Sequence, residues 1–221
     1  MISKNITDFL KKLKKNNNTD WFHSNKKQYL LAKEEFESFV NIVIYEISRF
    51  DKSISHLDVK DCMFRINRDI RFSNDKSPYK TNFGAYLARG GKKSTFAGYY
   101  IHIDPEEYFL SGGLYMPESN ILKTVRKEIY ENTDEFRKII NNTTFKKHFD
   151  GLLEDGKLKS APRDFPKDFP GIDLLKYKHY IVSKDQSEKM IHSSNFMHEI
   201  KTVFQAVYPF NSFINKAIEN I

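Results

Sequence analysis

The sequence lacks the features that mark several common protein classes. It has one cysteine, Cys62, in 221 residues, which excludes an intramolecular disulfide framework and a cysteine-based zinc site. Its apolar runs span only a few residues, far short of the roughly 20 that a membrane helix needs. No apolar segment followed by small residues occurs at the N-terminus, so no secretory signal is predicted. We therefore expect a cytoplasmic protein without a membrane partner.

Signature motifs of familiar cofactors and catalytic centres are also missing. The sequence contains no GxGxxG, GxxxxGK[ST], HExxH or GxSxG, which excludes the usual dinucleotide, P-loop and zincin signatures. His102 and Asp104 stand two residues apart, as on one strand face, but no third metal ligand accompanies them. We expect neither a cofactor nor a metal.

What the sequence does have is aromatic residues and positive charge. Aromatic residues make up 14% of the chain and charged residues 29%, which is typical of a globular protein rather than a disordered one. The net charge of +7 invites a nucleic-acid interpretation. The lysines are spread along the whole chain, however, as an AT-rich genome would produce. Local clustering of charge therefore carries more weight than the total.

The spacing of apolar residues predicts helices at both ends of the chain and strands between them. Helices are predicted at 5–15, from about 21 to 50, at 119–131 and 133–141, in the short segment IDLLKYK, and at 187–220 with a break at Pro209. Strands are predicted at 62–66, 83–88, 96–103 and 108–116, with an edge strand at HYIVS. Three prolines preclude a helix over 151–171, a candidate linker whose Phe165 and Phe169 favour packing onto the body. This order predicts a single α+β domain over residues 1–221, a central antiparallel meander flanked by N- and C-terminal helices.

Residues 65–84, RINRDIRFSNDKSPYKTNFG, concentrate charge around a predicted turn at 75–79. The cations are Arg65, Arg68, Arg71, Lys76 and Lys80. Arginine offers a planar fork of donors suited to phosphate or carboxylate, and lysine acts as a point charge. One interpretation is an anion site in which Asp69 and Asp75 orient the arginines. The other is a structural ion-pair network in which these two acids neutralise two of the cations.

A glycine pair within the last predicted strand of the meander offers a second wall for such a site. Gly112 and Gly113 in mid-strand indicate a bulge or a close approach of ligand or backbone. We expect the turn at 75–80 and the strand at 111–115 to form opposite walls of a concave pocket. If chemistry occurs there, Lys76, Tyr79 and Asp75 are the candidate acid–base groups.

Four blocks of the sequence, RDIRFSNDKSPYKTNFGAY, NNNTDWF, SGGLYMP and DFPGIDLLKYK, resemble in order those of a bacterial family catalogued as domain of unknown function 2461. The resemblance spans most of the chain, and implies one α+β domain of about this length. It implies no activity. The motif residues that it carries onto this chain are Trp21, Phe22, Arg68, Asp69, Arg71, Phe72, Asp75, Lys76, Pro78, Tyr79, Lys80, Gly84, Gly112, Gly113 and Pro117.

Three functions remain open at this point. The first is a pocket for a small phosphate- or carboxylate-bearing ligand, with or without enzymatic activity. The second is a nucleic-acid backbone binder, in which Trp21, Tyr79 or Phe72 would stack on bases. The third is a structural or protein-interaction module without a ligand. The candidate ligand-binding residues are Arg65, Arg68, Asp69, Arg71, Asp75, Lys76, Tyr79, Lys80, Gly112 and Gly113.

Overall fold

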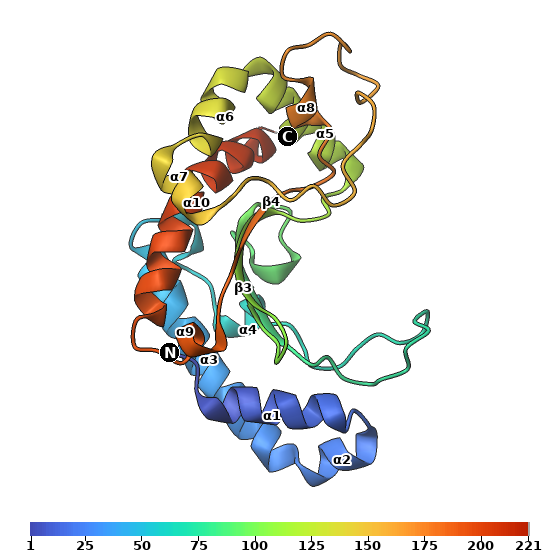
Figure 1. The fold of residues 1–221 in the computed structure, drawn as a ribbon, viewed down its shortest axis with the longest axis vertical. Helices are drawn as coiled ribbons and strands as arrows, with labels where there is room; N and C mark the ends of the chain where they lie inside the picture. The colour runs from blue at the N-terminus through green and yellow to red at the C-terminus, as the bar shows by residue number, and fades with distance from the viewer. Residues whose placement is uncertain (221) are drawn as a thin grey trace.

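A four-stranded antiparallel sheet lies between N-terminal and C-terminal helices in the computed structural model, which describes residues 1–220 (Figure 1). The strands are β1 (Phe83–Leu87), β2 (Gly98–Ile103), β3 (Tyr108–Leu114) and β4 (Tyr180–Asp185). The α-helices are α1 (Lys4–Lys15), α2 (Thr19–Ser24), α3 (Lys26–Ser48), α4 (Val59–Cys62), α5 (Ser119–Glu131), α6 (Thr133–Ile140), α7 (Thr143–His148), α8 (Ile172–Leu175), α9 (Glu188–Ile191) and α10 (Phe196–Glu219). Short 3₁₀ helices are η1 (Lys52–Ile54) and η2 (Gly91–Lys93). The predicted α+β class is confirmed.

The strand order is β1-β2-β3-β4, with every neighbour antiparallel. The first three strands form the predicted meander, and a turn closed by reciprocal backbone hydrogen bonds between Asp104 and Glu107 joins β2 to β3. β4 comes from much later in the chain and pairs with β3, as the predicted edge strand.

One side of the sheet is buried under helices. Ala85, Ile101 and Leu110 pair in register across three strands and are fully buried. In Figure 1, α10 and α3 lie on one side of β3 and β4. Each large aliphatic side chain buried here contributes roughly 1.5–3 kcal/mol to folding. Because side chains alternate along a strand, the residues between them point to the opposite side, which stays half-exposed in places.

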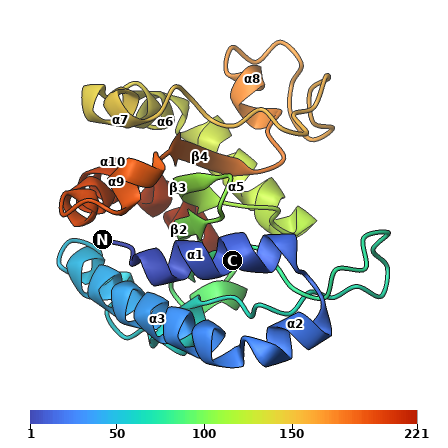
Figure 2. The same cartoon turned by 60° about the horizontal axis from the view of Figure 1, so that its bottom comes forward.

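The N-terminal helices and two long loops surround this core. The single helix predicted from 21 to 50 is instead two helices, α2 and α3, and α1 lies beside α3 (Figure 2). The proline-containing loop after α7 packs onto the body as expected, since Phe165 and Phe169 contact Tyr130 at ring-centroid distances of 5.6 and 4.6 Å. The segment between α4 and β1 projects away from the body in both views. No helix within residues 1–220 is long and apolar enough to cross a membrane.

The strand predicted at 62–66 is wrong. Cys62 ends α4, and the chain after it makes only isolated bridges, from Met63 to Ala85 and from Asn67 to Tyr79. This segment first follows β1 and then turns to pair with its own return path, so it never meets one partner for long enough to form a regular strand.

The predicted helix break at Pro209 is also wrong, because α10 continues through it. Proline has no backbone N–H, so the helix lacks the hydrogen bond that another residue at position 209 would donate to the carbonyl oxygen of Gln205. Both residues are exposed, so water can satisfy that carbonyl, while the buried face of α10 packs without interruption.

The closest approach of α10 to the sheet depends on Gly112. A Cβ at this position would lie 2.8 Å from both γ carbons of Val207. We expect Gly112→Ala to lower the free energy of unfolding by about 1–3 kcal/mol, because overpacking forces the helix away from the strand. Urea denaturation of Gly112→Ala, Val207→Ala and the double variant measures the coupling. In the Val207→Ala background the glycine substitution should cost less, and an equal cost in both backgrounds would contradict the proposed clash.

Candidate functional site

The charged loop between α4 and β1 neutralises much of its own charge. Arg68 donates to Asp75 from its guanidinium and also to the carbonyl oxygen of Ser77, at 3.2 Å. Arg71 donates to both carboxylate oxygens of Asp69, at 2.9 and 2.7 Å. Two of the three arginines of the motif, Arg68 and Arg71, are therefore held by the two aspartates within the loop, as the ion-pair interpretation expects.

The same contacts shift the titration of these acids. The backbone N–H and hydroxyl of Ser77, followed by the guanidinium of Arg68, lower the pKa of Asp75 to about 2. Arg71 lowers the pKa of Asp69. Lys76 donates to the carbonyl oxygen of Ile70 at 3.1 Å. Asp75 is therefore ionised at neutral pH. A carboxylate with so low a pKa is a weak base, so Asp75 is unsuited to act as a general base at that pH.

Tyr79 anchors the loop to the N-terminal helices. Its ring is 6% exposed and stacks on Phe22 with centroids 3.9 Å apart and planes 15° apart. The Asn17 side-chain amide accepts from the backbone N–H of Tyr79 at 3.1 Å and donates to its carbonyl oxygen at 2.9 Å. The two motif blocks NNNTDWF and SPYK thus contact each other, and Tyr79 has a packing role in the structure.

The two glycines of β3 lie against protein rather than against the charged loop. Gly112 faces Val207 of α10. Gly113 has φ +117°, and a Cβ there would lie 2.0 Å from the carbonyl oxygen of Tyr180. The expected close approach is present, but it is an approach of protein backbone and helix, so the strand does not form a wall opposite the turn at 75–80.

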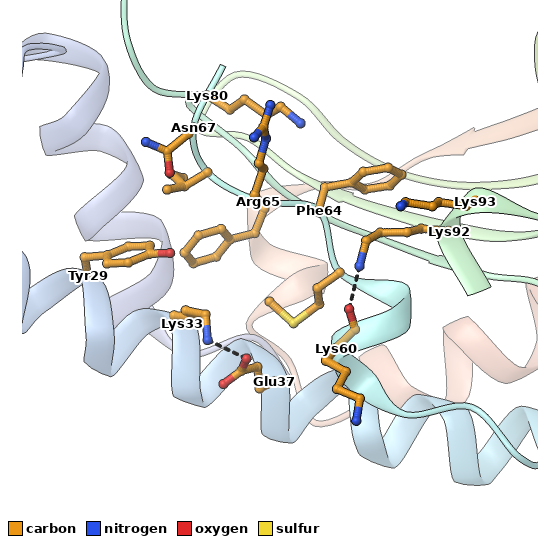
Figure 3. Close-up of a pocket in the computed structure, with 13 residues that line it drawn as sticks. Tyr29, Lys33, Glu37, Lys60, Phe64, Arg65, Asn67, Lys80, Lys92 and Lys93 are labelled. Carbon is orange, nitrogen blue, oxygen red and sulfur yellow. Dashed lines mark hydrogen bonds and ion pairs between the residues drawn. The ribbon is translucent and has the colours of Figure 1, made fainter. Parts of the chain in front are cut away.

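The remaining two cations of the motif, Arg65 and Lys80, lie on a different feature, a groove of about 650 Å³ beside α3 (Figure 3). We call it the basic groove. Its lining residues are Tyr29, Lys33, Glu37, Lys60, Met63, Phe64, Arg65, Ile66, Asn67, Lys80, Phe83, Lys92 and Lys93.

Six of these side chains are cationic and one is acidic. Lys33 pairs with Glu37 at 2.6 Å, and Lys60 pairs with Asp58 at 3.0 Å outside the groove. Within residues 1–220, neither Arg65 nor Lys80 has an acidic partner. Burial, together with the charge of Arg65, lowers the pKa of Lys80. Figure 3 shows the ends of these two side chains close to each other. Two like charges therefore lie side by side without a counter-charge.

The groove also contains cations that the sequence pattern did not single out. Lys92 and Lys93 come from η2, after β1, and Lys33 and Lys60 come from earlier helices. Lys92 donates to the carbonyl oxygen of Lys60, which ties η2 to α4. The adjacent pair Lys92-Lys93 after a Gly-Gly turn was recognisable in the sequence as a local cluster of positive charge. The sequence did not show that this pair lines the same groove as Arg65, because that depends on how β1 returns past α4.

The two possible metal ligands, His102 on β2 and Asp104 in the turn after it, make separate contacts. Asp104 accepts from Thr81 at 2.7 Å and lies 3.6 Å from the ammonium of Lys14. His102 instead bonds to Tyr100 through Nδ1, at 2.9 Å. Among residues 1–220, no three His, Cys, Asp or Glu side chains gather as a metal site would require.

The loop ion pairs have a measurable signature in the titration of Asp75. We expect carbon-13 NMR to give this carboxyl a pKa of about 2, below its ordinary 3.8. Its ionised form then favours the folded loop above about pH 4, and this contribution disappears as the pH falls from about 4 to about 2. Arg68→Gln should raise the pKa only partly, because the Ser77 contacts remain. Arg71→Gln is the matched control, which should raise the pKa of Asp69 and leave that of Asp75 unchanged. A pKa of Asp75 that does not respond to Arg68→Gln would exclude the pairing.

Comparison with known proteins places the chain in one family. A family model described as Conserved hypothetical protein (DUF2461) matches residues 5–213, which covers the sheet, the basic groove and the helices as far as Phe213 within α10. No curated protein and no solved structure matches the chain. The resemblance seen in the motif blocks is therefore confirmed over almost the whole sequence, and the chain belongs to the DUF2461 family.

Proposed function

We propose that this protein binds a small phosphate- or carboxylate-bearing ligand in the basic groove. The observation that carries the proposal is the pair Arg65 and Lys80, whose charges adjoin each other and form no ion pair with an acid of residues 1–220. Like charges held close together destabilise a fold unless something relieves the repulsion. A bound anion would relieve it, and the guanidinium of Arg65 offers the fork geometry that phosphate and carboxylate accept.

The surroundings of this pair suit a ligand of limited size. Lys92 and Lys93 lie on the η2 side of the groove, while Tyr29 and Phe83 supply apolar surface. Lys80 lies over the ring of Phe64, with its ammonium 5.3 Å from the ring centroid. Cations from four separate segments thus converge on one groove, and a volume of about 650 Å³ is within the range of small-molecule sites.

A nucleic-acid backbone is the second candidate, and one observation favours it. Phe72 at the tip of the projecting loop is 96% exposed, and Phe64 beside the groove is 36% exposed. Single-stranded nucleic acid is bound by such a combination of cations and open aromatic rings. Tyr79 cannot serve in this role because its ring is buried on Phe22. Trp21 is half-buried, with its ring stacked on Phe9 at 6.2 Å.

Substitution of the two unpaired cations tests the groove. We expect Arg65→Gln and Lys80→Gln each to weaken pyrophosphate binding roughly tenfold, the loss typical of a charge-assisted hydrogen bond. Isothermal titration calorimetry measures this loss. Arg71→Gln should retain full affinity, since Asp69 already holds its guanidinium. Lys189→Gln removes an exposed charge elsewhere and controls for net charge.

The same variants separate a ligand site from a purely structural role. Removing one of two repelling charges should leave the melting temperature unchanged or raise it by a few degrees. A marked fall for Arg65→Gln and Lys80→Gln, with no pyrophosphate binding by the wild type, would instead support a structural module. Tight, salt-sensitive binding of a single-stranded oligonucleotide that Phe72→Ala abolishes would favour the second candidate.

A further inference from the structure

The half-exposed side of the sheet has a residue composition that is unusual for the solvated face of an antiparallel sheet. Such a face ordinarily carries charged and polar residues in alternation with the core. Here the outward positions of β1, β2 and β3 carry no charged side chain, and aromatic or imidazole rings occupy four of them. These rings are Tyr86, Tyr100, His102 and Phe109.

Three of these rings form a connected group with Phe64. The rings of His102 and Phe109 are stacked, with centroids 4.6 Å apart and planes 8° apart. Tyr100 contacts Phe109 at 5.7 Å and meets Phe64 edge-on at 6.1 Å. We call these four residues the ring face. All four retain some solvent exposure, unlike the side chains on the helix side of the sheet.

Gly84 makes room for this arrangement. A Cβ at Gly84 would lie 2.6 Å from the hydroxyl oxygen of Tyr100, so any larger residue would displace that ring. The Tyr100 hydroxyl then reaches Nδ1 of His102, at 2.9 Å. Gly84 belongs to the motif block of the charged loop, so the same block that supplies Lys80 also shapes the ring face.

The chemistry of His102 adds a hydrogen-bond donor to this surface. Burial raises the pKa of Tyr100 to about 12, so its hydroxyl keeps its proton at neutral pH. Burial also lowers the pKa of His102, so that imidazole is neutral. The Tyr100 hydroxyl and the Asn82 amide both approach Nδ1 and both can donate to it, at 2.9 and 3.5 Å. The ring proton is then on Nε2, which has no hydrogen-bond partner within residues 1–220.

The ring face adjoins the basic groove through a shared residue. Phe64 lines the groove and also contacts Tyr100, and the ammonium of Lys80 lies over the same Phe64 ring. A ligand whose anionic group contacts Arg65 and Lys80 therefore has an aromatic surface next to it.

We propose that the ring face is a second subsite of the basic groove and takes a planar heterocyclic ring of the ligand. The inference rests on the proposed anion binding and names its ligand class as a phosphorylated heterocycle of nucleotide size. Phe64 and Tyr100 supply apolar ring surface, and Nε2 of His102 donates to a ring nitrogen or carbonyl. The outward positions of β1, β2 and β3 carry no charged side chain, which suits a neutral ring, and the cations of the groove suit the phosphate.

Two ligands with the same phosphate test this assignment without altering the protein. Adenosine monophosphate and ribose 5-phosphate differ in the ring alone. We expect calorimetry to show adenosine monophosphate binding about tenfold more tightly, in line with the contribution of stacking one base on an aromatic side chain. Tyr100→Leu should remove most of that difference while leaving ribose 5-phosphate affinity unchanged, because Tyr100 belongs to the ring face and does not line the groove. Tyr45→Leu, which removes an exposed ring on α3, is the matched control and should preserve the difference.

The outcomes separate the two proposals. Equal affinities of the two ligands for the wild type would overturn the ring subsite and leave the anion groove intact. A preference for adenosine monophosphate that persists in Tyr100→Leu would overturn the placement of the ring. If pyrophosphate and both sugar phosphates fail to bind, the groove itself is not an anion site and the inference fails with it.

Discussion

The burial of one side of the sheet under α10 and α3 is the constraint on which the rest of the molecule depends. It requires large aliphatic residues on that side, and it requires Gly112 where Val207 comes closest. Once this contact is made, α3 runs along the end of the sheet at β1, and the chain leaving α4 must return beside β1. The basic groove forms at this junction, so its position follows from the packing of apolar surfaces rather than from attraction among its charges.

The charged motif of the family serves two physical purposes in this chain. Its middle part is internally neutralised, because Arg68 and Arg71 bind Asp75 and Asp69, and the stack of Tyr79 on Phe22 fixes the loop to the N-terminal helices. Its two ends differ. Arg65 and Lys80 leave the loop and enter the groove, whose one acid, Glu37, pairs with Lys33. A self-paired loop thus holds two cations that form no ion pair within residues 1–220, and the proposed ligand would supply the missing negative charge.

Much of the fold was predictable because local patterns report directly on burial. The alternation in β2 and the apolar stripe of α3 each depend on one element meeting one apolar surface. Two of the errors occurred where that condition fails. The segment after Cys62 pairs with two different neighbours, and Pro209 lies on the solvent side of a helix whose other side is continuously packed. A local sequence pattern does not tell which distant segment a stretch of chain will pair with, or which side of a helix will face water.

By itself, the sequence determined the α+β class, the family motif and the presence of an unusual group of cations. It left open whether the arginines face the aspartates or a ligand, since both arrangements use the same residues at the same spacing. Only the tertiary structure decided this, because the path of the chain puts Asp75 within reach of Arg68 and leaves Arg65 and Lys80 without an ion pair among residues 1–220. It also brought Lys33, Lys60, Lys92 and Lys93 to the same groove and Phe64 to Tyr100. These contacts join segments far apart in the chain, and they exist only once the sheet and helices have packed.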